Sequence, residues 1–139
     1  MAKSTAEKLL IRPGTTVWAA PADGLERLGP LPAGVRVAPS AAGAATAFLF
    51  AADAAALRSL LDEHATGAGA AATLWIAYPK GGRSDINRDT VWPIAAEHGL
   101  RPIGQVAIDD EWSALRFRRL AEGEAPFTGR QATPSKEMA

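Results

Sequence analysis

Residues 71–92 read AATLWIAYPKGGRSDINRDTVW, and this stretch decides the fold class. Residues 73–78 are apolar without alternation, which is typical of a strand buried on both faces of a sheet. A loop rich in glycine and charge follows, and a helix starts near Thr90. In open α/β sheets, the loops that leave the carboxyl ends of strands are where ligands bind. The stretch therefore predicts the place of a site, although no catalytic motif accompanies it.

A second continuous apolar run occupies residues 46–51 and predicts another buried strand. Asp53 is a good N-cap for the helix that follows. In that helix Leu57, Leu60, Leu61 and His64 recur at helical spacing and form one apolar stripe. We expect Gly67 and Gly69 to end the helix. Strands that alternate with helices imply a parallel sheet with right-handed crossovers.

The remaining elements complete a small three-layer α/β sandwich. We expect short helices at 6–10 and 25–28, strands at 15–20 and 35–38, and a helix at 91–98 with Thr90 as N-cap and Pro93 in its first turn. Residues 101–108 and 112–118 predict a C-terminal antiparallel hairpin. Residues 1–120 then form a single domain. Residues 121–139 lack hydrophobic periodicity and predict a disordered tail.

Composition excludes several classes of protein. The 139 residues carry zero net charge, no cysteine and two histidines. A nucleic-acid-binding domain is normally basic, so nucleic acid is disfavoured as a partner. Disulfides and cysteine-bound zinc are impossible. The first residues lack the apolar run of a signal peptide, and no segment approaches the roughly 20 apolar residues that span a bilayer. We expect a cytoplasmic protein without a membrane partner.

The segment Arg12-Pro13-Gly14, with residues 15–18 after it, resembles the opening of the first strand in class I S-adenosylmethionine-dependent methyltransferases. The expected order of elements is similar to theirs as well, and those enzymes also end in an antiparallel pair. The resemblance therefore implies a Rossmann-like, mostly parallel sheet. They follow the first strand with a glycine-rich turn and an acidic residue for the cofactor. Here residues 19–24 read AAPADG, and no acidic residue follows the second strand. We therefore predict no cofactor and no methyl transfer.

A closer resemblance is to small actinobacterial proteins that share a domain of unknown function. The segments that carry it span residues 7–118, and they are Arg12-Pro13-Gly14, Pro79-Lys80-Gly81-Gly82-Arg83, Gly99-Leu100, and Trp112-Ser113 with Arg116. This resemblance implies the same fold and brings no known activity. Whether the chain is an enzyme stays open at this point.

The loop after residues 73–78 is the candidate ligand site. Lys80, Arg83 and Arg88 could cradle a phosphate or carboxylate, helped by glycine amides and by the helix N-terminus. The alternative is a solvated loop in which Asp85 and Asp89 pair locally. Trp112 starts a strand and could border the same cleft. The candidate residues are Lys80, Gly81, Gly82, Arg83, Asp85, Asn87, Arg88 and Trp112.

Other polar and aromatic residues favour structural interpretations. Asp109, Asp110 and Glu111 form a polar turn more readily than a metal site. Trp75 lies mid-strand and is expected in the core. We predict no catalytic residue and no metal. Two function classes remain open: a domain that binds a small anionic ligand, or a module that docks a protein partner or its own copy.

Overall fold

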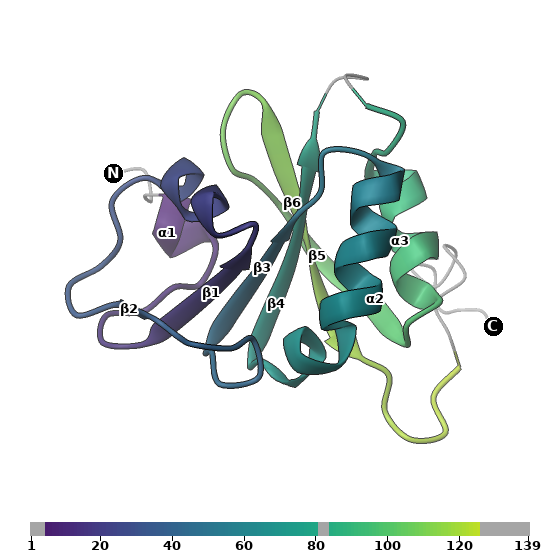
Figure 1. Ribbon diagram of the computed structural model, residues 1–139, viewed down its shortest axis with the longest axis horizontal. Helices are drawn as coiled ribbons and strands as arrows, with labels where there is room; N and C mark the ends of the chain where they lie inside the picture. Colours follow the sequence, from purple (N-terminus) through teal and green to yellow (C-terminus); the bar gives the residue numbers. More distant parts are fainter. Residues whose placement is uncertain (1–4, 81–83, 126–139) are drawn as a thin grey trace, which may run out of the picture.

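The computed structural model describes residues 5–80 and 84–125. Six strands and four helical segments make up this part of the chain (Figure 1). In chain order they are α1 (Thr5–Lys8), β1 (Thr16–Ala20), the 3₁₀ helix η1 (Ala22–Leu28), β2 (Arg36–Val37), β3 (Thr46–Phe50), α2 (Ala54–Ala70), β4 (Thr73–Pro79), α3 (Arg88–Ala96), β5 (Leu100–Ala107) and β6 (Trp112–Arg119).

The strands form one sheet in the order β2-β1-β3-β4-β6-β5. The first four strands in that order are parallel, and β6 runs antiparallel to both β4 and β5. Helices α2 and α3 lie on one side of the sheet, and α1 and η1 lie on the other (Figure 1). The predicted mostly parallel sheet with a C-terminal antiparallel pair is confirmed.

Both faces of the central strands are covered, which explains their continuous apolar runs. On one face, α2 and α3 pack against Leu49 and Ile76. On the other, α1 and η1 pack against Phe48 and Trp75. Trp75 is 2% exposed, and its indole nitrogen donates a hydrogen bond to the Leu9 carbonyl at 2.9 Å. The prediction that Trp75 belongs to the core is confirmed.

Helix α2 corrects one predicted boundary. Asp53 caps its start, where the Asp53 carboxylate accepts from the Ala56 amide at 2.8 Å. The helix nevertheless continues through Gly67 and Gly69 to Ala70. A Cβ at Gly69 would lie 2.9 Å from Nε of Arg119, whose guanidinium donates to the Thr66 carbonyl at 2.7 Å. Gly69 therefore permits the close approach of β6 and does not end the helix.

Helix α3 begins at Arg88, three residues before the predicted start, and ends at Ala96. Asn87 is the N-cap, since its side chain accepts from the amides of Asp89 and Thr90. The Thr90 hydroxyl accepts in return from the Asn87 amide at 2.7 Å. Thr90 is thus the second half of a capping box and not the cap itself. Pro93 consequently lies inside the helix, beyond its first turn.

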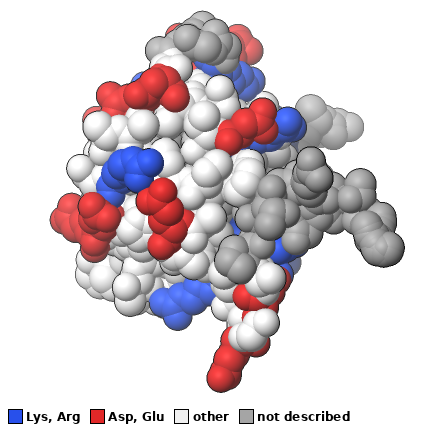
Figure 2. Space-filling model, turned by 90° about the vertical axis from the view of Figure 1, so that its right-hand side faces the viewer, with Lys and Arg blue, Asp and Glu red and all other residues white. Residues whose placement is uncertain are grey.

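The surface over α3 carries mixed charge. Figure 2 shows acidic and basic side chains interspersed on this side of the molecule, without a broad patch of one sign. Arg58 on α2, for example, pairs with Glu97 at 2.9 Å. Within the described residues, no helix is both long and apolar enough to cross a membrane.

After β6, residues 121–125 fold back toward the sheet. The guanidinium of Arg118 holds both carboxylate oxygens of Glu124, at 2.9 and 2.8 Å, and the Ala121 amide donates to the same carboxylate at 2.7 Å. The predicted tail of residues 121–139 stays a prediction, because residues 126–139 lie outside the described part of the chain.

Candidate functional site

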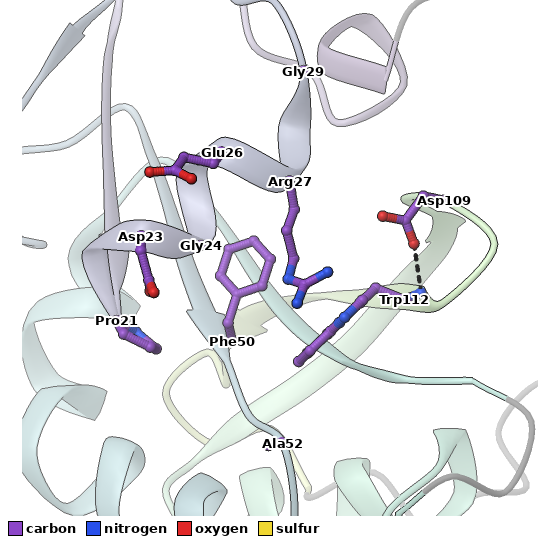
Figure 3. Close-up of a pocket in the computed structure, with 10 residues that line it drawn as sticks. All are labelled: Pro21, Asp23, Gly24, Glu26, Arg27, Gly29, Phe50, Ala52, Asp109 and Trp112. Atoms are coloured by element: carbon purple, nitrogen blue, oxygen red, sulfur yellow. Dashed lines mark hydrogen bonds between the residues drawn. The ribbon is translucent and has the colours of Figure 1, made fainter.

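The strand order places a natural binding position at the carboxyl ends of β1 and β3. Strand β1 has β2 on one side and β3 on the other, so the direction of chain progression reverses between β1 and β3. Ligands of open α/β sheets bind in the crevice at such a point. A pocket of about 700 Å³ opens there, which we call the carboxyl-edge pocket (Figure 3). It is lined by Pro21, Asp23, Gly24, Glu26, Arg27, Gly29, Phe50, Ala52, Asp109 and Trp112.

The 3₁₀ helix η1 builds one wall of this pocket and packs directly on Phe50. Gly24 sits over the Phe50 ring, and a Cβ at Gly24 would overlap with that ring. Phe50 itself is 5% exposed. In dinucleotide-binding folds, a long helix starts after the first strand and points its N-terminal amides at phosphate. The seven-residue η1 offers no comparable helix start.

Trp112 forms the opposite wall and is held by two other side chains. Its ring and the Phe50 ring pack edge to face, with ring centroids 5.8 Å apart and planes 62° apart. The Arg27 guanidinium lies 4.7 Å from the Trp112 ring centroid and points toward it in Figure 3. Arg27 also lies 4.0 Å from the Glu111 carboxylate. The positive charge of Arg27 is therefore already engaged by a ring and by an acid.

Three carboxylates and one guanidinium line the pocket. Asp109 is fixed by its own turn, because its carboxylate accepts from the amides of Glu111 and Trp112, both at 2.8 Å. The carboxylates of Asp23 and Glu26 pair with no cationic side chain of the described residues. Carboxylates only accept hydrogen bonds. The pocket thus suits a ligand that offers donors or positive charge more than an anion.

Of the eight residues predicted from the sequence, Trp112 lines this pocket. Lys80 lies near the pocket, because its backbone amide donates a hydrogen bond at 2.8 Å to the carbonyl of Glu111, the residue before Trp112. Arg88 lies on α3 and contacts the neighbouring Asp89 at 3.4 Å. Gly81, Gly82 and Arg83 fall outside the described residues.

Asp85 and Asn87 both cap helices. The Asp85 carboxylate accepts from the Ala54 amide at 2.8 Å, in the first turn of α2, and Asn87 caps α3. The N-terminal amides that an anion would use are in part already engaged by these side chains. Ser84 ties the loop to the pocket, because its hydroxyl donates to the Ala52 carbonyl at 2.6 Å. The loop and the carboxyl-edge pocket are therefore neighbours.

Among residues 5–80 and 84–125, no group of three or more His, Asp or Glu side chains could hold a metal ion. The turn at Asp109 is instead closed by its own hydrogen bonds to amides.

Comparison with known proteins gives the architecture and nothing more specific. No family model matches this chain, and no curated protein sequence matches it. A protein of the NADB-Rossmann superfamily from Streptococcus agalactiae superposes with a TM-score of 0.50 at 9% identity, over 92% of this chain and 71% of that one. The fold is Rossmann-like.

A second solved structure is similar at the same level. It is a proposed tRNA (m1A22) methyltransferase from Streptococcus pneumoniae, with a TM-score of 0.49 and 10% identity, and the match covers 93% of this chain and 74% of that one. In the Rossmann-like chain described here, the carboxyl-edge pocket occupies the usual ligand crevice of such folds.

Proposed function

We propose that this chain is a non-catalytic Rossmann-like domain that binds a small ligand in the carboxyl-edge pocket. The observation that carries the proposal is the convergence of Phe50, Trp112 and three carboxylates at the switch point of the sheet. The pocket volume of about 700 Å³ lies in the range of ordinary small-molecule sites. Its ten lining residues include no hydroxyl, thiol, amine or imidazole side chain, so they offer neither a serine- or cysteine-type nucleophile nor a histidine base.

The lining also indicates the chemistry of the ligand. Trp112 is half-buried and lines the pocket, so its indole offers an aromatic surface for a flat ring. Asp23 and Glu26 are exposed carboxylates that can accept hydrogen bonds from hydroxyl or amino groups. A ring that carries such donors fits this pocket better than a phosphate does, because Arg27 is already engaged by Glu111 and Trp112.

A thermal-shift screen against a metabolite library tests this proposal, since a ligand that binds only the native state raises apparent stability. We expect at least one hit with the wild type. The hit should be lost in Trp112→Ala and kept in Arg58→Gln, a surface variant on α2. A screen without hits, or hits that survive in Trp112→Ala, would contradict the proposal.

We infer that the methyltransferase resemblance is one of architecture without the cofactor. The contact between Gly24 and Phe50 occupies the region just after β1, where the cofactor turn of those enzymes would start. Titration calorimetry with S-adenosylmethionine should give no saturable heat. Binding at one site with micromolar affinity would overturn this inference. Membership of the actinobacterial family and a cytoplasmic location stay predictions from the sequence.

The loop at residues 80–88 remains a second candidate, as an anion contact beside the pocket. The observation that favours it is the hydrogen bond between Ser84 and Ala52, which places the loop against the pocket wall. Lys80 and Arg88 are its described cations. If the loop binds an anion, Lys80→Ala with Arg88→Ala should weaken binding of an anionic ligand and leave the affinity of a neutral pocket ligand unchanged. Equal affinities for the anion would exclude the loop.

The alternative of a protein-docking module gains less support. The large apolar side chains that the described residues expose are Leu10, Val37 and Ile103. Val37 lies on β2 and Ile103 on β5, and these strands form opposite edges of the sheet. One contiguous apolar patch therefore does not contain both, although interfaces usually need such a patch. Docking of a partner or a second copy stays a prediction that sedimentation can test.

A further inference from the structure

A second pocket lies at the opposite ends of the same strands. Its volume is about 250 Å³, and we call it the amino-edge pocket because it sits where β3 and β4 begin. It is lined by Leu10, Arg12, Thr15, Ala45, Thr46, Ala72, Thr73 and Arg116. Two arginines and no acidic residue thus share a small pocket in a chain of zero net charge.

Arg116 carries a polar atom that the fold leaves unsatisfied. Its Nε is buried and has no hydrogen-bond partner, and it is the one such side-chain atom among the described residues. Arg116 lies on β6, in register with Trp75 on one side and Gly104 on the other. A buried donor without a partner costs free energy, and native proteins rarely leave one. Arg116 also lines the amino-edge pocket, so the terminal nitrogens of the same guanidinium are the atoms left to meet a bound anion.

Arg12 reaches the same pocket from the segment before β1. A tight turn fixes its backbone, because the amide and hydroxyl of Thr15 both donate to the Arg12 carbonyl, at 3.3 and 2.6 Å. Among the described residues, neither Arg12 nor Arg116 forms an ion pair. Two guanidinium groups at one pocket repel each other unless an anion lies between them.

Threonine hydroxyls complete the lining. Thr46 on β3 and Thr73 on β4 are register partners, so their side chains share one face of the sheet. Trp75 lies two residues after Thr73 and therefore on that face, and its register partner Arg116 projects from the same side. The hydroxyls of Thr46 and Thr73 bond to no described residue, which leaves them free to donate.

We propose that the amino-edge pocket binds a phosphate group, either as the free ion or as the charged end of a small metabolite. Guanidinium groups match phosphate oxygens with paired hydrogen bonds, and two further hydroxyl donors suit an anion with more than two oxygens. The volume of about 250 Å³ admits an ion or one charged group and little else. This site is independent of the carboxyl-edge pocket and of the function proposed for it.

Nuclear magnetic resonance of arginine Nε–H groups tests the proposal directly. The ¹⁵N-labelled full chain is titrated with inorganic phosphate, with chloride adjusted to hold ionic strength constant. The Arg116 signal is assigned by its loss in Arg116→Lys. We expect that signal to move and to saturate, because phosphate binds the guanidinium group that carries this Nε–H. The Arg58 signal, on the opposite face, serves as an internal control and should stay in place.

The variant Arg12→Gln provides the second arm. Arg12 is exposed, so its replacement should leave folding intact. It should weaken phosphate binding by at least about tenfold, the scale of a lost charge-assisted hydrogen bond. Arg58→Gln should leave the affinity unchanged. A stationary Arg116 signal, or the same affinity in Arg12→Gln as in the wild type, would overturn the proposal.

Discussion

The carboxyl-edge and amino-edge pockets lie on the same face of one sheet, at opposite ends of the same strands. Along β3, Phe50 lines the first pocket and Thr46 the second. Along β6, Trp112 lines the first and Arg116 the second. These pairs are four residues apart, so alternation puts both members on one face. The core between the two pockets contains Phe48 and Trp75.

The two pockets differ in how their arginines are compensated. Arg27 in the carboxyl-edge pocket has an acid at 4.0 Å and an aromatic face at 4.7 Å. Arg116 in the amino-edge pocket has a buried nitrogen without a partner. The carboxyl-edge pocket thus combines an engaged arginine with the carboxylates of Asp23 and Glu26, so it favours a ligand that offers hydrogen-bond donors or positive charge. The amino-edge pocket is incomplete until an anion enters, so the two ends of one sheet favour different ligands.

Replacing Trp75 should have the largest effect, because it removes the core between the pockets. Trp75→Ala should lower the free energy of unfolding by about 3–5 kcal/mol, as a large-to-small core change. Trp75→Phe keeps most of the volume and loses the bond to the Leu9 carbonyl, which should cost about 1 kcal/mol. Urea denaturation measures both. Equal losses in the two variants would mean that the hydrogen bond, and not the ring volume, holds this face together.

A smaller loss is expected at the carboxyl-edge pocket alone. Gly24→Ala forces a Cβ against the Phe50 ring and should cost about 1–3 kcal/mol, the scale of overpacking. Gly43→Ala is the matched control, since its Cβ would meet the nearest atom at 3.6 Å, an ordinary contact. It should change stability by less than about 0.5 kcal/mol. If both variants are equally stable, η1 is not seated on Phe50 as described.

A third arginine, Arg118, is paired with an acid as Arg27 is, and this pair makes stability depend on pH. Arg118 on β6 holds the pKa of Glu124 down to about 2, from its ordinary 4.5, chiefly by its hydrogen bonds, with the Ala121 amide adding to the effect. Because the folded pKa is depressed, the contribution of this pair to stability is present above about pH 4.5. It is lost as pH falls from there through about 2.

The Glu124 carboxyl carbon, followed by nuclear magnetic resonance, should therefore titrate with a midpoint near 2 in the wild type. In Arg118→Gln the midpoint should rise toward the ordinary value of 4.5. A wild-type midpoint already at the ordinary value would show that residues 121–125 are not held by Arg118.

The fold could be predicted because its strongest signals are local. Runs 46–51 and 73–78 are apolar throughout since both faces of β3 and β4 are covered, and Asp53 caps α2 as expected. The start of α3 was misplaced because Asn87 and Thr90 are both good caps and act together in one capping box. Gly67 and Gly69 do not end α2 as the sequence predicts. Gly69 instead leaves room for the side chain of Arg119, a residue far along the chain.

The sequence predicts a ligand site in the loop at residues 80–88, and that site stays a prediction, whereas the carboxyl-edge pocket has no signal of its own in the sequence. The loop after β4 is rich in charge, whereas residues 21–24 after β1 read as an ordinary turn. The pocket forms where η1, the end of β3 and the start of β6 meet. No residue spacing in the sequence indicates that these three segments lie together. Likewise, no spacing indicates that Arg12 and Arg116 line one pocket. Their segments were noted separately, and the topology alone brings them to one pocket.

The arginine of the carboxyl-edge pocket is engaged by Glu111 and Trp112, whereas Arg116 of the amino-edge pocket awaits an anion. Urea denaturation of Arg27→Met and Arg116→Met, with and without inorganic phosphate at equal ionic strength, tests this difference most directly. At about ten times the dissociation constant, phosphate should stabilise the wild type and Arg27→Met by about 1.4 kcal/mol. It should not stabilise Arg116→Met. Equal stabilisation of the two variants, or none in the wild type, would contradict the account.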